Sequence, residues 1–360
     1  VAAAGADDTV VLTKDVTLTE AIAINGKAVT IDLNGKVVTA TSAVFLVKNG
    51  AELNLSNGTV NATGDNSIVV WSEGAGSVAN EVNLDEVTLT ADTFVIYHNG
   101  LKYGADITIN NSTLTSAESV AVYLAGRATV DNNWAEGKQN TLVIEDSKIT
   151  GVSAVETKRG AVTVKGDSEL TATAETATMT PNKSGPASSG YALALTGNAG
   201  IAVGSANVTG GTFNGKIGIE VTENVTNDAT FAVSGGIFSE EVPAEYCAEG
   251  YIPVKNNNGT YGVKKAGFVK LQITEQPVSV TTNLDTKAVF KVSTIGEDLT
   301  YQWQYRTGST GTWKSTSETG NKTAQLTVPA TASWNGYEYR CKVTDSNGNV
   351  FYSNVAKLNV

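Results

Sequence analysis

The sequence contains very few of the residues that build metal centres, redox sites and nucleophilic catalytic sites. Its 360 residues include one histidine, one methionine and two cysteines, Cys247 and Cys341. Structural zinc sites need several clustered Cys or His ligands, and a redox motif needs a close CxxC pair. The sequence therefore predicts no metal and no cofactor. Only His98 could serve a Ser-His-Asp arrangement.

Basic residues are outnumbered, and long apolar runs are missing. Lys and Arg total 25 against 36 Asp and Glu, which gives a net charge of −11. Nucleic-acid binding depends mainly on basic side chains that neutralise phosphates, so no nucleic-acid partner is expected. Crossing a bilayer as a helix takes about 20 apolar residues, and no stretch approaches that length, so no membrane span is expected in this chain.

Residues typical of strands and turns are abundant, and their charge changes along the chain. The chain has 47 Thr, 31 Asn and 36 Gly, which is typical of an all-β protein rich in turns. Residues 270–360 carry 9 basic and 7 acidic side chains, whereas the preceding residues carry 16 and 29. This shift predicts two domains, 8–265 and 271–360. Residues 1–7 (VAAAGAD) are typical of the remnant left by a removed secretory signal and are excluded from the fold.

A repeated strand–turn–strand unit fills the first domain. Most of the turns have an Asn, Asp or Gly, which tolerate a left-handed backbone, and a second series of glycines ends strands at a similar period. The strands are too short for helices, and each period matches one coil of a parallel β-helix whose strands pair with their equivalents one coil later, about 4.8 Å away. The expected turn residues are Asn34, Asn57, Glu86, Asn111, Asp146, Gly166, Gly210 and Gly235, and the strand-ending glycines are Gly50, Gly74, Gly100, Gly126 and Gly160.

Two intervals between successive turn residues, Asn111 to Asp146 and Gly166 to Gly210, are longer than the period. They contain the segments 127–139 and 173–190. The second segment is rich in Pro, Ser and Gly, which favours a long loop on one side of the coils, although two irregular coils would also fill the interval. In solenoids such insertions gather on one face, which is often the working face.

The end of the first domain is expected to cover the last coil. Residues 238–263 predict a short helical turn from Pro243 and a hairpin around Asn258-Gly259. The segments GGIFS, PAEYCAEGY and NGTYGV resemble the cap of bacterial surface β-helices of the pectin-lyase-like type. The resemblance implies a right-handed parallel β-helix.

The second domain has alternating strands with turns every 8 to 12 residues, as in a β-sandwich. Trp303 is expected in the core, and Tyr339 and Cys341 have the Tyr-x-Cys spacing of a tyrosine corner. Val292 stands where the second cysteine of an immunoglobulin domain would be. This pattern resembles bacterial immunoglobulin-like (Ig-like) modules of surface proteins, in which Cys341 would be a buried apolar residue; a Cys247–Cys341 disulfide is the alternative. The expected strands are 287–293, 299–306, 324–330, 336–345 and 350–360.

Because β-helices host polysaccharide lyases and hydrolases, clusters of acidic or basic residues on the coils are candidate catalytic groups. Hydrolases need a close pair of carboxylates, but the acids here are scattered singly, and Asp146 is explained as a turn residue. The one basic cluster, Arg127, Lys158 and Arg159, is interpreted as solvated surface charge. His98 is expected at the rim, where a strand becomes a turn.

Aromatic residues recur at the period of the coils. Trp71, Tyr97 and Tyr123 are each 26 residues apart and are expected to stack on three successive coils, facing outward, with Trp134 extending the same wall. An outward aromatic stripe suits stacking on sugar rings or burial in a protein interface. The alternative is that these rings are structural or are covered by the 127–139 insertion.

Together these features predict an all-β protein with a right-handed parallel β-helix and a C-terminal Ig-like β-sandwich. We expect a non-enzymatic, secreted or cell-surface protein that binds a glycan or a host or cell-surface protein. Two alternatives are a carbohydrate-active β-helix enzyme, either a lyase or a hydrolase, and a purely structural stalk.

Overall fold

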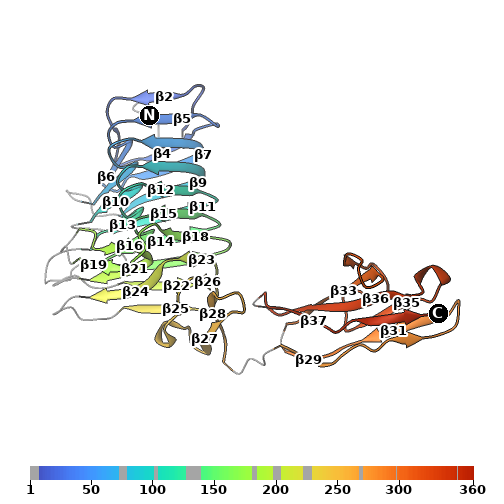
Figure 1. The fold of residues 1–360 in the computed structure, drawn as a ribbon. Coiled ribbons are helices and arrows are strands. Elements are labelled where there is room, and N and C mark those ends of the chain that lie inside the picture. Colours follow the sequence, from blue (N-terminus) through green and yellow to red (C-terminus); the bar gives the residue numbers. More distant parts are fainter. Residues whose placement is uncertain are drawn as a thin grey trace. The chain divides into compact units, whose positions relative to one another are not determined.

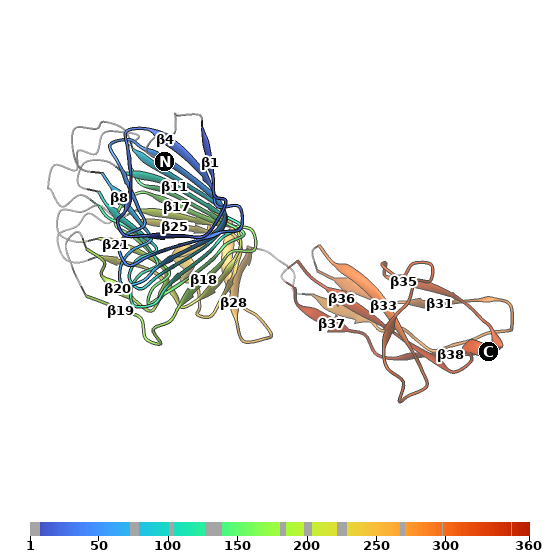
Figure 2. The same ribbon diagram turned by 90° about the horizontal axis from the view of Figure 1, so that it is seen from above.

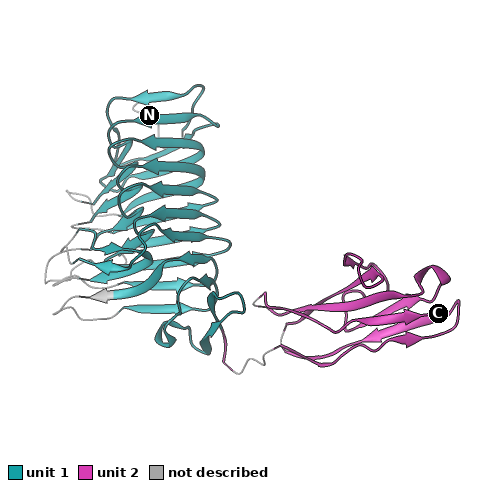
Figure 3. Ribbon diagram, in the orientation of Figure 1, with its two compact units in different colours: residues 1–263 teal, residues 264–360 magenta. Residues whose placement is uncertain are grey.

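The chain forms two compact units, residues 1–263 (unit 1) and 264–360 (unit 2), in a computed structural model (Figures 1 and 3). The structure describes residues 8–72, 79–100, 104–126, 139–180, 185–197, 204–221, 229–266, 271–296, 298–346 and 348–360. In these ranges all regular structure is strand except two 3₁₀ turns, η1 (Ala244–Tyr246) and η2 (Ala332–Trp334), which confirms the predicted all-β class. No helix long and apolar enough to cross a membrane occurs there.

Unit 1 is built from three columns of parallel strands. Each strand pairs with its equivalent in the next repeat, which is compatible with a β-helix or similar solenoid. Seen from above, strands of successive repeats lie over one another (Figure 2). The first column contains β1 (Thr9–Val11), β4 (Ala28–Asp32), the first part of β7 (Glu52–Ala62) and of β9 (Asn80–Ala91), β11 (Ala105–Asn110), β14 (Thr141–Glu145), β17 (Ala161–Lys165), β22 (Ser205–Val208) and β25 (Thr230–Val233).

The second and third columns follow the same order along the chain. The second contains β2 (Val16–Leu18), β5 (Val37–Ala40), the later parts of β7 and β9, β12 (Thr113–Ser116), β15 (Lys148–Gly151), β18 (Glu169–Ala172), β23 (Thr212–Asn214) and β26 (Ile237–Phe238). The third, which we call sheet 3, contains β3 (Ile22–Asn25), β6 (Phe45–Lys48), β8 (Ile68–Trp71), β10 (Ile96–Asn99), β13 (Val122–Leu124), β16 (Val155–Thr157), β21 (Tyr191–Gly197) and β24 (Lys216–Val221).

The turns between the first two columns use left-handed residues, as the sequence predicts. Six of the eight expected positions have positive φ, from 47° at Asn111 and Asp146 to 64° at Gly166. The last two predictions are wrong by one residue, because Gly211 and Gly236 carry the positive φ instead of Gly210 and Gly235. Gly235 is still required, since a Cβ there would lie 2.3 Å from the Thr209 carbonyl oxygen.

The long interval between Gly166 and Gly210 holds a single coil with a hairpin excursion. β16 pairs directly with β21, and β18 pairs with β23, so no extra coil is inserted. The excursion contains β19 (Thr178–Met179) and β20 (Ser188–Ser189), which pair antiparallel. The other insertion, 127–139, lies outside the described residues except for its last residue.

The predicted cap is present at the end of unit 1. After β26 the chain forms η1 directly behind Pro243, then β27 (Tyr251–Lys255) and β28 (Tyr261–Lys265). Gly259 turns with φ +90°, and the Asn256 amide donates to the Thr260 carbonyl oxygen at 2.8 Å. β28 runs antiparallel to β26, so the parallel stacking of the second column ends here.

Unit 2 is built from small, mainly antiparallel sheets around its own core. β33 (Thr300–Thr307) pairs with β36 (Tyr337–Thr344) and with β34 (Lys314–Ser315); β36 also pairs with β37 (Val350–Tyr352) and β38 (Ala356–Asn359), and β38 with β30 (Val280–Thr281). Separate pairs join β31 (Lys287–Lys291) to β35 (Gln325–Pro329) and β29 (Gln272–Glu275) to β32 (Ser293–Ile295). Trp303 and Cys341 are register partners, and both are fully buried with Val292 beside them in the core. Both cysteines are free thiols.

Candidate functional site

The predicted aromatic ladder does not form one column. Tyr97 and Tyr123 are register partners, but Tyr97 pairs with Val69 on the preceding coil, and Trp71 pairs with Asn99. The register between β8 and β10 advances by 28 residues, whereas that between β10 and β13 advances by 26. Trp71 is therefore displaced by two residues, roughly 6.6 Å along the strand, and the prediction of a regular 26-residue stack is wrong at this ring.

The ladder residues differ sharply in exposure. Tyr97 and Tyr123 stack with ring centroids 5.8 Å apart, and Phe94 packs against both rings. They form a small cluster separate from the main core, while the alternating residues Val122 and Leu124 point into that core. Tyr123 is fully buried, Tyr97 is half-buried and Trp71 is 36% exposed, so no continuous exposed stripe exists here. Trp134 lies outside the described residues.

The expected surface charge at Lys158 and Arg159 is buried, and that prediction is wrong. Glu156 and Lys158 are both 0% exposed and form an ion pair with Nζ 3.5 Å from Oε1. Arg159 is also buried. Burial lowers the pKa of both cations, although Glu156 counteracts the effect at Lys158. Arg127, the third member of the predicted cluster, lies outside the described residues.

Glu156 attaches the hairpin excursion to the outer side of sheet 3. Its carboxylate accepts the backbone amides of Ala187 and Ser188 at 2.9 Å each, and the Ser188 hydroxyl at 2.7 Å. The Thr196 hydroxyl donates to the same group at 2.9 Å, and Lys158 donates to Thr196. A carboxylate so enclosed is not accessible to a polysaccharide. The arrangement is that of a structural clamp.

His98 lies inside the coils and not at the rim, so this prediction is also wrong. Its side chain is 0% exposed, and its Nε2 lies 3.0 Å from the Ser72 hydroxyl. His98 is two residues from Ile96, and side chains two apart on a strand share a face. The same alternation that places Ile96 in the core therefore places the histidine there.

Two of the scattered acids of unit 1, Glu145 and Asp146, contact residues of the next repeat. Asp146 Oδ1 accepts the Asp167 amide at 2.8 Å across neighbouring turns. Glu145 pairs with Lys165 at 2.7 Å, one coil away. Among the residues that the structure describes, no three His, Cys, Asp or Glu side chains gather as a metal site would require.

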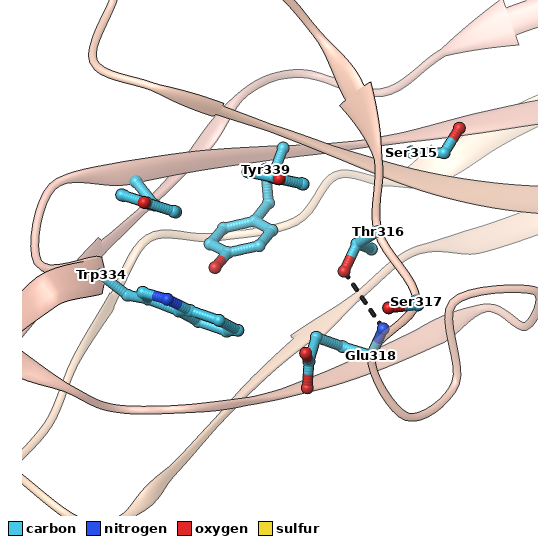
Figure 4. Close-up of a pocket in the computed structure, with 8 residues that line it drawn as sticks. Ser315, Thr316, Ser317, Glu318, Trp334 and Tyr339 are labelled. Atoms are coloured by element: carbon cyan, nitrogen blue, oxygen red, sulfur yellow. Dashed lines mark hydrogen bonds between the residues drawn. The ribbon is translucent and has the colours of Figure 1, made fainter.

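Among the residues that the structure describes, a cavity in unit 2 is a candidate site. It has a volume of about 180 Å³ and is lined by residues from β33, β34, β36, η2 and the loop after β34 (Figure 4). We call it the aromatic cavity. Its lining residues are Tyr305, Ser315, Thr316, Ser317, Glu318, Trp334, Tyr337 and Tyr339.

Parallel aromatic rings form one wall of the aromatic cavity. The Tyr337 ring lies between those of Tyr305 and Trp334, at centroid distances of 5.8 Å and 5.9 Å and interplanar angles of 5° and 8°. Tyr339 comes from the same strand as Tyr337 and is 1% exposed. Its hydroxyl points toward the space between Trp334 and Thr316 (Figure 4).

The polar groups around this space have unused hydrogen-bonding capacity. Within the described ranges, no hydrogen bond is formed by the Glu318 carboxylate, the Trp334 ring nitrogen or the hydroxyls of the three lining tyrosines, although the Glu318 amide donates to Thr316 Oγ1 at 3.2 Å. None of these atoms is fully buried, so solvent or a ligand can reach them. Burial, followed by the nearby Glu318 charge, raises the pKa of Tyr339. The aromatic cavity thus combines apolar ring surface with convergent donors and acceptors, which is the chemistry of a small-ligand site.

The candidate site residues predicted from the sequence lie only on the first domain, so the prediction missed this cavity. The sequence does contain a signal, since Trp334, Tyr337 and Tyr339 follow closely on one another, and of these three only Tyr339 is fully buried. A scan against protein-family models finds no match for this sequence, and a search of curated proteins finds no similar chain.

Proposed function

We propose that this chain is a non-enzymatic glycan-binding part of a secreted or cell-surface protein, and that the aromatic cavity holds a sugar residue. The observation that carries the proposal is the stack of Tyr305, Tyr337 and Trp334 beside polar groups that have no hydrogen-bond partner in the described ranges. Sugars present apolar C–H faces to aromatic rings and hydroxyls to polar groups, and the cavity offers both surfaces. At about 180 Å³ it is smaller than sites for drug-sized ligands, which suits a single sugar unit.

The finer architecture belongs to the same proposal. Unit 1 would be a right-handed β-helix of the pectin-lyase-like type, and unit 2 a bacterial Ig-like sandwich. The parallel pairing of equivalent strands supports the first assignment. The burial of Trp303, Tyr339 and Cys341 in one core supports the second.

The test is a glycan array, followed by calorimetric titration of the full chain with the glycans retained. Trp334→Ala should weaken binding at least tenfold, about 1.4 kcal/mol. Tyr352→Ala, which removes an exposed aromatic of the same unit that does not line the cavity, should leave binding unchanged. Circular dichroism and thermal unfolding of both variants confirm that they are folded.

Three results would contradict the proposal. Binding that survives Trp334→Ala but is lost in Trp71→Ala would place the site on unit 1, as the ladder hypothesis predicts. Absence of binding across the array would remove the glycan function. Release of reducing ends or unsaturated uronates from polysaccharides would identify an enzyme.

A further inference from the structure

The side chains that line the aromatic cavity carry a negative charge. Its eight lining residues include one carboxylate, Glu318, and no lysine or arginine. Glu318 is half-buried and forms no ion pair with the described part of the chain. A ligand in the cavity therefore meets a carboxylate that has no ion-pair partner among the described residues.

The arginines nearest along the strands are engaged elsewhere. Arg306 donates to Glu338 at 2.7 Å and stacks over Trp313. Arg340 lies over the rings of Trp313 and Tyr352, with its guanidinium carbon 4.3 Å and 4.1 Å from the two centroids. Arg306 follows Tyr305 in β33, and Arg340 follows Tyr339 in β36. Because neighbouring side chains on a strand point to opposite faces, both arginines face away from the side of the sheet that carries these tyrosines.

The rings that line the cavity favour a cation as well. Trp and Tyr faces carry a negative quadrupole potential that attracts ammonium groups, most strongly where water is excluded. Trp334, Tyr305 and Tyr337 supply such rings, and Tyr339 is almost completely buried beside them. Aromatic faces together with one unpaired carboxylate form a site for a positively charged ligand group.

Building on the proposed function, we propose that the sugar bound in the aromatic cavity carries a free amine, and that Glu318 pairs with its ammonium group. The cavity then selects an amino sugar over its N-acetylated form, which has no charge. It rejects a uronic acid, whose carboxylate would meet Glu318 without a compensating cation.

The closing experiment compares sugars that differ only at the amine. Glucosamine oligosaccharides in the fully deacetylated and fully N-acetylated forms, and galacturonate oligosaccharides, are titrated into the full chain at 0.15 M salt. There the Debye length of about 8 Å limits non-specific attraction to the acidic chain. The deacetylated oligomer should bind at least tenfold more tightly than the acetylated one, and galacturonate should not bind.

Two variants separate the site from general electrostatics. Glu318→Gln should weaken binding of the deacetylated oligomer at least tenfold and leave the acetylated one unchanged. Glu241→Gln removes one exposed charge from unit 1 and should change neither. Equal affinity for the two oligomers, or an equal effect of Glu318→Gln on both, overturns the amine assignment. If binding still depends on Trp334, glycan binding stands; if the amine oligomer binds equally well to Trp334→Ala, both proposals fall.

Discussion

Replacing Glu156 with alanine is expected to detach the hairpin 173–190 from sheet 3. The substitution removes the acceptor for the amides of Ala187 and Ser188 and for the hydroxyls of Ser188 and Thr196. It also leaves Lys158 buried without its counter-ion. Breaking a buried ion pair by removing one partner typically costs about 3–5 kcal/mol, because the remaining charge is uncompensated.

Local opening of the hairpin lets water reach the amides that Glu156 no longer binds. We therefore expect Glu156→Ala to lower the free energy of unfolding by about 4 kcal/mol, which is less than the sum over all the lost hydrogen bonds. Lys158→Met should cost less, since the Glu156 carboxylate keeps its four neutral donor groups. With Glu156 gone, only desolvation acts on Lys158 and its folded-state pKa falls further below the unfolded value. Below that folded-state pKa, Lys158 is charged in both the folded and the unfolded chain, and Glu156→Ala has its full destabilising effect. As the pH rises toward about 10.4, where the unfolded lysine also loses its proton, the effect diminishes.

Urea unfolding and amide hydrogen exchange at 187–190 measure the two consequences separately. The Glu156→Leu/Lys158→Met double variant separates the two contributions. It removes the uncompensated charge of Lys158 but still leaves the Ala187 and Ser188 amides without their acceptor, so it should recover only part of the lost stability. A loss below about 1 kcal/mol in Glu156→Ala, or hydrogen exchange at 187–190 that is unchanged in both variants, would refute the clamp.

Three further predictions concern buried positions. Burial raises the pKa of the Cys341 thiol to about 12, so at pH 8 an alkylating reagent should modify Cys341 only after unfolding. The half-buried Cys247 should react in the folded chain. Mass spectrometry of the labelled peptides distinguishes the two cysteines. Ser147→Ala leaves the buried Ser112 amide without its acceptor at 3.0 Å and should lower the free energy of unfolding by about 1–2 kcal/mol; an unchanged urea midpoint would contradict the role of this serine. Gly235→Ala places a Cβ against backbone and should reduce the yield of folded protein, and normal expression with an unchanged melting temperature would show that the backbone yields.

The repeating strands and turns of unit 1 could be predicted because their signals are local. A left-handed turn favours Asn, Asp or Gly at one position. Asn34, Asn57 and Asn111 occupy three of the first four such positions, and Glu86 occupies the other. The interior position of His98 could also be predicted, because His98 is two residues from Ile96 on the same strand. The rim position expected for His98 follows from the nearby turn, but the alternation of the strand decides where its side chain lies.

The burial of Glu156 and Lys158 could not be predicted, because it depends on contacts distant in sequence. Ala187 and Ser188, which are 31 and 32 residues after Glu156, donate to its carboxylate, and Thr196 contacts both Glu156 and Lys158. The aromatic cavity has the same origin: Tyr305, Glu318 and Trp334 meet only after the strands of unit 2 have paired. Composition reveals that such residues exist, but the fold decides which of them share a space.

A crystal structure of the full chain soaked with the deacetylated glucosamine oligosaccharide would test the central claim most directly. We predict density for a sugar residue in the aromatic cavity, against Trp334 and with its amine within hydrogen-bonding distance of the Glu318 carboxylate. An empty cavity with the oligosaccharide bound instead beside Trp71 and Tyr97, or nowhere on the chain, would contradict the claim.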